Sequence, residues 1–168
     1  MTVRPLVFLD VDGTLLPYAG AEVPTTVQGW VEWQLPSNPH LATIDRDHVP
    51  RLLALPCDLV WATGWMHDAN TVLAPLLDLP SLPVAALPDA PYENNFDVLH
   101  WKTQVLVETA AGRPFAWIDD ELGDLDREWV KANHDGQALL LRVDSQTGLT
   151  TDDLTTVENW VRQAAGCP

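Results

Sequence analysis

Two carboxylates, Asp10 and Asp12, follow a short apolar run near the start of the chain. The run, residues 6–9, has no polar residue, as expected of a strand buried on both faces, and Gly13 permits a sharp turn and the close approach of a ligand. Paired carboxylates without cysteine or histidine suit a hard cation such as Mg²⁺, and an aspartate can also attack phosphorus. The other interpretation is a strand that ends in a solvated Asp-Gly turn.

Three further segments place polar or charged residues beside apolar runs. These are Thr63 with Gly64, Lys102, and the acidic pair Asp119 and Asp120. Each has a structural explanation by itself: the end of a strand, a surface lysine on an amphipathic helix and the cap of a following helix. However, all of them lie at the carboxyl end of an expected strand or at the adjoining helix start, and open α/β sheets bind ligands at that edge. Their joint placement therefore favours one shared site.

The elements that must position these residues alternate along the chain. Short apolar runs separated by amphipathic segments are typical of a parallel sheet covered by helices. We expect an α/β fold, a Rossmann-like three-layer sandwich with a five-stranded parallel sheet. The expected strands cover residues 5–10, 57–62, 82–87, 114–118 and 138–143, and Pro83 makes the third of them the least regular.

Residues 16–46 interrupt this alternation directly after the first strand. The stretch 29–35 has the pattern of an exposed strand between prolines, which predicts a small hairpin or flap that overhangs the site. Trp30 and Trp33 in this flap, and Trp65 after the second strand, are candidate substrate contacts, since an indole can stack on a base or sugar. The alternative is that these tryptophans belong to the core.

The four segments, taken in order, resemble the motifs of the haloacid dehalogenase (HAD) superfamily. Residues 6–15 match the first motif, an apolar strand followed by Asp-x-Asp-Gly-Thr, and the other three motifs follow up to residue 120. The resemblance implies a single HAD-like hydrolase domain over residues 1–168, with the flap at about 16–46 and no large cap domain. The segments 100–103 and 112–117 also look like small phosphatase-like domains associated with RNA repair.

The resemblance also implies a role for each motif residue. Asp10 would be the nucleophile, and Asp12 would protonate the leaving oxygen and then activate water. Phosphate would be bound by Thr63, Gly64 and Lys102, and Mg²⁺ by Asp10, Asp12 (through its backbone carbonyl), Asp119 and Asp120. The implied activity is a Mg²⁺-dependent phosphoric monoester hydrolase with an aspartyl-phosphate intermediate. The alternative is a non-catalytic interaction module that has kept the HAD fold.

The charge of the chain limits the classes of binding partner that we expect. Nine Lys and Arg against 24 Asp and Glu give a formal net charge of −15, so we expect no broad basic surface for nucleic acid. A phosphorylated nucleic-acid end could still be a substrate, and a nucleotide or a small phosphorylated metabolite is the other candidate. The oligomeric state and any lid from a partner chain are not determined by the sequence.

The remaining composition indicates a soluble chain in a reducing compartment. No stretch approaches the roughly 18 apolar residues that would span a bilayer, and the N-terminal apolar run lacks the cleavage site of a signal peptide. Cys57 and Cys167 are far apart and in no metal or redox spacing. We therefore expect a cytoplasmic protein with no membrane partner.

Overall fold

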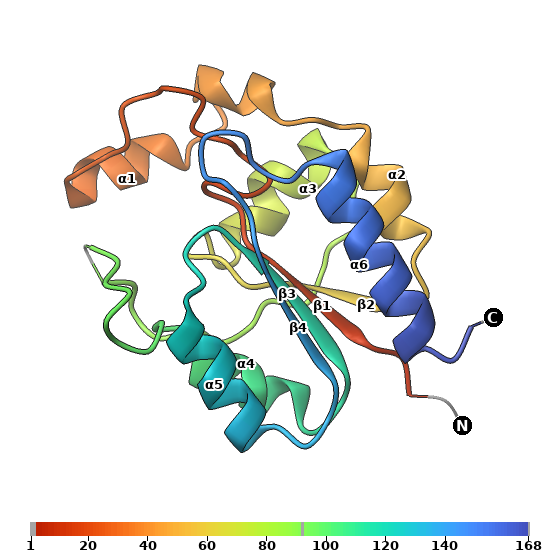
Figure 1. Cartoon of the computed structure of the whole chain (residues 1–168). Helices are drawn as coiled ribbons and strands as arrows, with labels where there is room; N and C mark the ends of the chain where they lie inside the picture. Colours follow the sequence, from red (N-terminus) through yellow and green to blue (C-terminus); the bar gives the residue numbers. More distant parts are fainter. Residues whose placement is uncertain (1–2, 92, 168) are drawn as a thin grey trace.

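Four parallel strands form the sheet at the centre of the protein, in the order β2-β1-β3-β4. The computed structural model describes residues 3–91 and 93–167, and Figure 1 shows the strands running side by side between two layers of helices. Every residue of β1 and β3 is buried, because these central strands are covered on both faces. The strands are β1 (Leu6–Leu9), β2 (Asp58–Trp61), β3 (Phe115–Asp119) and β4 (Ala138–Arg142).

The sheet has four strands and not the expected five. The segment 82–87 runs beside β2 but joins it at one bridge, where the Trp61 N–H donates to the Pro83 carbonyl and the Ala85 N–H donates to the Trp61 carbonyl, both at 2.9 Å. Continuing this parallel ladder would require residue 83 to donate to the carbonyl of Leu59. Proline has no N–H, so the ladder stops there and no fifth strand forms.

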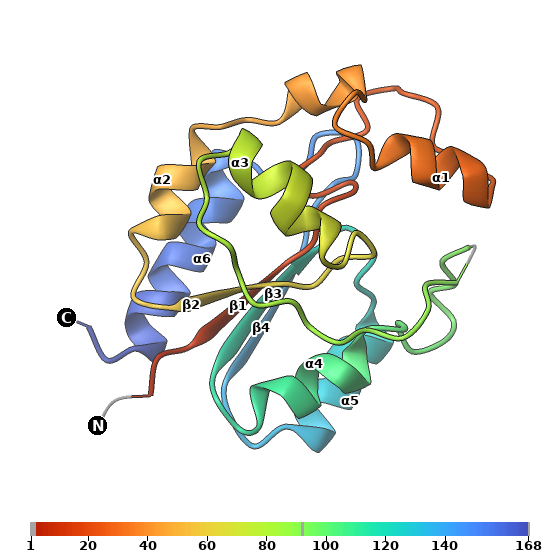
Figure 2. The same cartoon turned by 180° about the vertical axis from the view of Figure 1, so that it is seen from behind.

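Helices cover both faces of the sheet, as seen from opposite sides in Figures 1 and 2. Successive residues of each strand point to opposite faces, and they therefore belong to two separate apolar clusters. One face packs against α4 (Thr103–Ala110) and α5 (Asp124–Asn133). The other packs against α2 (His48–Leu53), α6 (Thr151–Ala164) and a π-helical turn η2 (Ala69–Leu73) that continues into α3 (Ala74–Leu76).

The longest helix, α6, begins and ends where its sequence indicates. The Thr150 hydroxyl accepts the N–H of Asp153 at 3.1 Å, and the Asp153 carboxylate accepts the N–H of Thr150 at 2.9 Å, which forms a capping box. Leu154, Val157 and Val161 follow at helical spacing and are fully buried against the sheet. No helix among the described residues is long and apolar enough to cross a membrane.

Residues 16–46 fold into helices, so the expected hairpin is wrong. They form α1 (Val27–Trp33) and a short 3₁₀ helix η1 (Pro39–Thr43). Thr26 caps α1, because its hydroxyl accepts the Gly29 N–H at 3.0 Å. None of the residues of α1 is buried, and the helix projects from the body of the protein in both views (Figures 1 and 2). The described residues contain no large cap domain, as expected.

Candidate active site

The carboxyl ends of β1 and β3 bring three carboxylates together. Leu9 pairs with Ile118 in the sheet, so Asp10 and Asp119, the next residue of each strand, lie side by side. Asp120 follows at the start of the loop after β3. One oxygen from each of the three aspartates lies within 4.8 Å of the other two. The sequence-based prediction of a shared acidic site at this edge is therefore matched by the geometry.

Lys102 joins two of these carboxylates. Its ammonium nitrogen lies 2.8 Å from Asp10 Oδ1 and 2.7 Å from Asp119 Oδ2, and the residue is only 3% exposed. It directly precedes α4, whose packing against the sheet brings the side chain to the edge of β1 and β3. Burial opposes the charged form of this lysine, but Asp10 and Asp119 outweigh it and hold the Lys102 pKa above its usual range.

Neutral donors fix the orientation of the same carboxylates. The Thr14 hydroxyl donates to Asp10 Oδ2 at 3.0 Å, so both oxygens of Asp10 are held. The Trp117 indole donates to Asp119 Oδ2 at 3.2 Å, and the Glu121 N–H donates to Asp119 Oδ1 at 3.0 Å. Two carboxylates are thus preorganised by hydrogen bonds from their own strands and loops.

One ammonium group does not neutralise three carboxylates. Burial raises the pKa of Asp10 to about 7, and the nearby Asp119 adds to the increase. Burial, Asp10 and Asp119 raise the pKa of Asp120 to about 10. Burial would also raise the pKa of Asp119, but Lys102 outweighs it, so this pKa lies below its usual value. The three carboxylates therefore resist being ionised together, and a bound cation would relieve the repulsion between them.

This donor set fits Mg²⁺. Carboxylate oxygens are the ligands that this hard cation prefers, and Asp10, Asp119 and Asp120 offer three of them within 4.8 Å of one another. The side chain of Asp12, the fourth expected ligand, points to two tryptophans (below) and does not belong to this group. This leaves its backbone carbonyl as the atom expected to bind the metal.

Gly13 allows the first and fourth motifs to approach each other. Its φ of +72° is a left-handed conformation that favours glycine. A Cβ at this position would overlap the Asp120 carboxylate, lying within 2.7 Å of its Cγ. The turn after Asp12 and the acidic loop after β3 are thus in van der Waals contact at a position that has no room for a side chain.

Thr63 and Gly64 lie at the same edge, after β2. Leu9 pairs with Trp61, and the Ala62 N–H donates to the Leu9 carbonyl at 2.8 Å, so Thr63 lies one residue beyond the level of Asp10. Thr63 is 1% exposed and its hydroxyl oxygen accepts the Trp65 N–H at 3.2 Å, which leaves its own proton available to donate. Gly64 is exposed. Both residues therefore lie at the same edge of the sheet as the acidic cluster, and phosphate binding by them stays a prediction.

Asp12 is held by two of the predicted substrate contacts. The indole nitrogen of Trp33 donates to Asp12 Oδ1 at 2.8 Å, and that of Trp65 donates to Asp12 Oδ2 at 3.0 Å. Trp65 is only 1% exposed, so it presents almost no surface on which a substrate could stack. Trp30 packs edge-on against Trp33, with ring centroids 6.3 Å apart. Burial raises the pKa of Asp12, and the two indole hydrogen bonds work against this increase.

The sequence reasoning missed Asp126. This carboxylate, 2% exposed, accepts the N–H of His100 at 2.8 Å, the Thr103 hydroxyl at 2.7 Å and the N–H of Gly123 at 2.9 Å. It therefore connects the segment that carries Lys102 to the loop after β3. The local pattern at Asp126 is that of an acidic residue in the first turn of a helix, which indicates a cap and not a contact with the Lys102 segment. Thr14 and Trp117, which were also missed as contacts, lie within the motifs.

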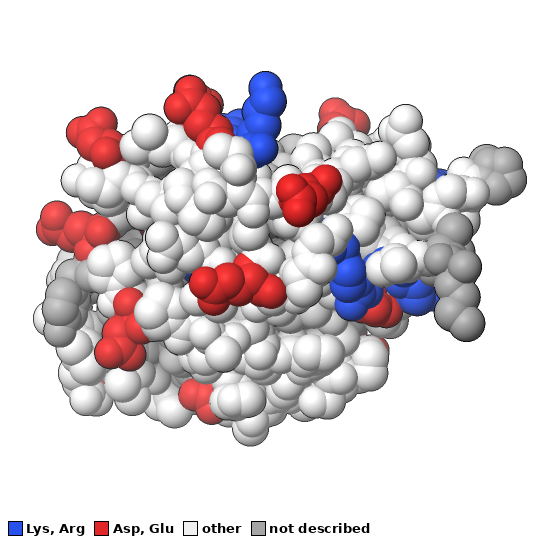
Figure 3. Space-filling view, turned by 90° about the horizontal axis from the view of Figure 1, so that it is seen from below, with Lys and Arg blue, Asp and Glu red and all other residues white. Residues whose placement is uncertain are grey.

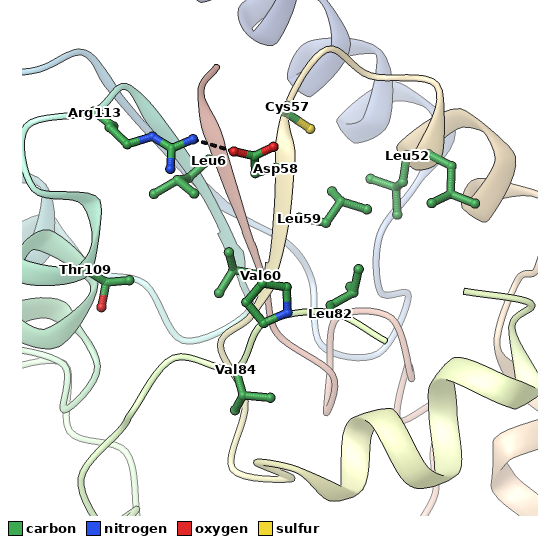
Figure 4. Close-up of a pocket in the computed structure, with 12 residues that line it drawn as sticks. Leu6, Leu52, Cys57, Asp58, Leu59, Val60, Leu82, Val84, Thr109 and Arg113 are labelled. Atoms are coloured by element: carbon green, nitrogen blue, oxygen red, sulfur yellow. Dashed lines mark hydrogen bonds and ion pairs between the residues drawn. The ribbon is translucent and has the colours of Figure 1, made fainter. Parts of the chain in front are cut away.

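A cavity of about 510 Å³ lies elsewhere, beside β2 (Figure 4). Apolar residues such as Leu59 and Val60 line it, and the Arg113–Asp58 pair at 2.6 Å lies at one end. None of the aspartates of the site, nor Lys102, contributes to its wall. This cavity is therefore separate from the acidic cluster at the sheet edge.

The fold and the acidic site together define a HAD-type domain. Residues 6–154 match the family of HAD domains in Swiss Army Knife RNA repair proteins, and the chain belongs to this family. Among solved structures, it is similar to the HAD domain of effector protein Lem4 from Legionella pneumophila, with a TM-score of 0.53 over 96% of this chain and 97% of that one. Their sequences are 10% identical, so this likeness concerns the fold alone. No curated protein matches the sequence.

Proposed function

We propose that this protein is a Mg²⁺-dependent phosphohydrolase that cleaves a phosphate monoester through an aspartyl-phosphate intermediate. The observation that carries the proposal is the cluster of Asp10, Asp119 and Asp120 with Lys102 at 2.8 Å and 2.7 Å from two of them. A nucleophilic carboxylate beside a buried ammonium, together with oxygen ligands for a hard cation, suits phosphoryl transfer.

In the first step, an Asp10 oxygen attacks phosphorus. The new bond joins Asp10 to the phosphoryl group, the bond from phosphorus to the leaving oxygen breaks, and Asp12 gives its proton to that oxygen. Lys102 offsets negative charge on the phosphoryl group and on Asp10, and the Thr63 hydroxyl and the Gly64 backbone hold a phosphoryl oxygen. The free alcohol then leaves.

In the second step, water attacks the phosphorus of the aspartyl phosphate. Asp12 takes a proton from the water, the bond between Asp10 and phosphorus breaks, and inorganic phosphate is released. Bound to the aspartate cluster, Mg²⁺ supplies the positive charge that lets an anionic phosphate approach. Both aspartates are then in their starting states.

Two substrate classes fit the proposal. Membership of a family named for RNA repair proteins favours the phosphorylated end of a nucleic acid. The net charge of −15 disfavours contact along a strand, and on the face in Figure 3 the acidic residues are scattered and the few basic ones form no continuous patch. An end bound through phosphate and one terminal nucleoside reconciles these observations, and a free nucleotide or small metabolite is the other class.

The test is metal-dependent hydrolysis. The purified chain is expected to hydrolyse 4-nitrophenyl phosphate with Mg²⁺, to lose this activity in EDTA and to recover it when Mg²⁺ is restored. Nucleotides, sugar phosphates and 5′- or 3′-phosphorylated oligonucleotides then rank the substrate classes by kcat/KM. If no phosphate ester is turned over, the phosphohydrolase proposal fails and the non-catalytic interaction module takes its place.

A further inference from the structure

Asp12 is held from two sides by elements that differ in how firmly they are fixed. Trp65 comes directly after Thr63 and Gly64 at the end of β2 and is 1% exposed, so its indole has the rigidity of the core. Trp33 is the last residue of α1, a helix with no buried residue. The two indoles together occupy both carboxylate oxygens of Asp12.

Trp33 is itself oriented by the segment around it. Its ring packs against Tyr18 and His40, at centroid distances of 6.3 Å and 5.2 Å. The His40 ring nitrogen lies 2.6 Å from the Pro17 carbonyl, and the Asn38 amide donates to the Trp33 carbonyl at 2.8 Å. The orientation of the Trp33 N–H towards Asp12 is therefore set by how α1 and η1 rest on the chain that follows β1.

An indole N–H can only donate a hydrogen bond, and its rigid ring fixes where that bond points. Two such donors restrict the carboxylate of Asp12 to one orientation. Without one of them, the short side chain is free to rotate between staggered positions, and only one of these directs an oxygen towards the leaving group. Misplacement of a reacting group by about 1 Å can lower a rate by about a hundredfold.

We propose that Trp33 and Trp65 are positioning residues for Asp12, and that α1 belongs to the acid–base apparatus through Trp33. This inference rests on the proposed phosphohydrolase function. It assigns α1 a role other than contact with substrate: the N–H of Trp33 directs the group that protonates the leaving oxygen.

The test compares two esters of nearly the same shape, phenyl phosphate and 4-nitrophenyl phosphate. The phenol oxygen needs the proton from Asp12, whereas 4-nitrophenolate is a better leaving group and needs it much less. Trp33→Phe keeps an aromatic ring and removes the N–H. We expect kcat/KM to fall by at least about tenfold on phenyl phosphate and by less than about threefold on 4-nitrophenyl phosphate. This ratio reports the step in which Asp12 acts as general acid and not the later attack of water, in which Asp12 acts as base.

Trp160→Phe is the matched control, because Trp160 is in the second half of α6, whose C-terminal end lies beside the start of β1 and so at the opposite edge of the sheet from Asp12 (Figure 1). It should leave the ratio of the two kcat/KM values unchanged. Trp65→Phe removes the second bond and should change the ratio in the same direction as Trp33→Phe. Equal losses on both esters, or no loss on either, in the Trp33 and Trp65 variants would overturn the inference while leaving the phosphohydrolase proposal intact. Inactivity of the unaltered protein on both esters would overturn both.

A second measurement observes the indole N–H groups directly and needs no turnover. It can still be made with one of the two phenylalanine variants if the other does not fold. The chain has eight tryptophans, and the indole N–H signals in a ¹⁵N–¹H spectrum can be assigned to Trp33 and Trp65 by the two phenylalanine variants. Asp12→Ala removes the acceptor of both bonds. These two signals should then move, while the signal of Trp160 stays in place. Unmoved signals for Trp33 and Trp65 would contradict the contacts on which the inference depends.

Discussion

The two sides of the site are built in different ways. On one side, the acidic cluster is carried by central strands whose residues are all buried, and Asp10, Lys102 and Asp119 are between 1% and 5% exposed. On the other side, α1 has no buried residue and rests on the contacts of the half-buried Trp33 ring with Tyr18 and His40. Asp10 and Asp12 lie two residues apart, yet Asp10 is held by Lys102 within the buried cluster, whereas Asp12 is held in part by Trp33 of α1.

Under the proposed mechanism, this difference separates the residues that hold and attack the phosphoryl group from Asp12, which must protonate different leaving groups. In the proposed mechanism, the nucleophile Asp10 and the expected metal ligand Asp119 are fixed by the sheet, where movement would disturb the core. The group that must meet a variable leaving oxygen is directed partly by an exposed helix, which has few core contacts and can change with little cost to the fold. Substitutions in the acidic cluster should therefore lower the rate or the stability. Substitutions on α1 should instead change how strongly the rate depends on the leaving group.

The largest effect is expected for Asp10→Asn. The amide is almost isosteric but is a poor nucleophile, so kcat should fall by at least about a thousandfold. Because burial and the neighbouring Asp119 disfavour the ionised form of Asp10, a neutral amide there should leave the melting temperature unchanged or raise it. Steady-state kinetics and thermal unfolding measure both. Retention of most of the activity would contradict a covalent role for Asp10.

Gly13→Ala should damage the rigid side next most strongly. A Cβ would overlap the Asp120 carboxylate, and φ at this position is +72°. We expect a loss of about 3 kcal/mol in the free energy of unfolding, combining backbone strain with steric overlap, and a large fall in kcat. Gly20→Ala is the control, since φ is +80° there and a Cβ meets nothing within 4 Å. Equal losses in both variants would show that only backbone conformation matters at Gly13.

Mg²⁺ should stabilise the same side. A ligand that binds only the native state at a hundred times its Kd adds about 2.7 kcal/mol to the free energy of unfolding. The melting temperature should therefore rise across a millimolar titration, and NaCl at equal ionic strength should not reproduce the increase. Asp119→Asn should remove most of the response. A metal response that survives in this variant would place the ion elsewhere.

Asp126→Asn tests the connection between the segment that carries Lys102 and the loop after β3. The amide nitrogen cannot accept a hydrogen bond, so at least one of the contacts from His100, Thr103 and Gly123 is lost. We expect a loss of about 1–2 kcal/mol in unfolding free energy, with a fall in kcat because the Lys102 segment loosens. The exposed Asp124→Asn should change stability by less than about 0.5 kcal/mol. Unfolding in urea compares the two variants.

The smallest effect on stability is expected for Trp30→Ala on α1. Because α1 has no buried residue, the free energy of unfolding should fall by less than about 1 kcal/mol, compared with about 3–5 kcal/mol for a buried tryptophan such as Trp65. If Trp30 contacts the leaving group, KM should rise for a nucleotide or oligonucleotide substrate and not for 4-nitrophenyl phosphate. Equal losses on large and small substrates would remove Trp30 from substrate recognition.

The rigid side could be predicted from the sequence because its information is local. Asp10, Thr63 and Asp119 each follow a continuous apolar run, and parallel strands place such residues at one edge of a sheet. Lys102 comes just before a helix whose start was predicted nearby. The two helix layers follow from the same alternation.

The rest depended on information that is not local. The aromatic and β-branched residues of segment 29–35 have strand propensity, whereas Thr26 as a cap and the spacing of Val27, Trp30 and Val31 fit the helix that forms. The bonds from Trp33 and Trp65 to Asp12 span 21 and 53 residues, and only the folded chain shows them. The contacts of Asp126 with His100 and Thr103, which span 26 and 23 residues, are of the same kind.

Pro83 has a consequence for the behaviour of the protein in concentrated solution. An unprotected outer strand of a sheet is a template on which other chains can add strands and aggregate. Here the chain after Leu82 lies along β2 and takes up the hydrogen bonds of Trp61, so part of that outer edge is already covered. Because Pro83 cannot donate a hydrogen bond, this covering segment also resists being drawn into a longer ladder. One residue that shortens the sheet by a strand thus also protects the molecule from self-association through β2.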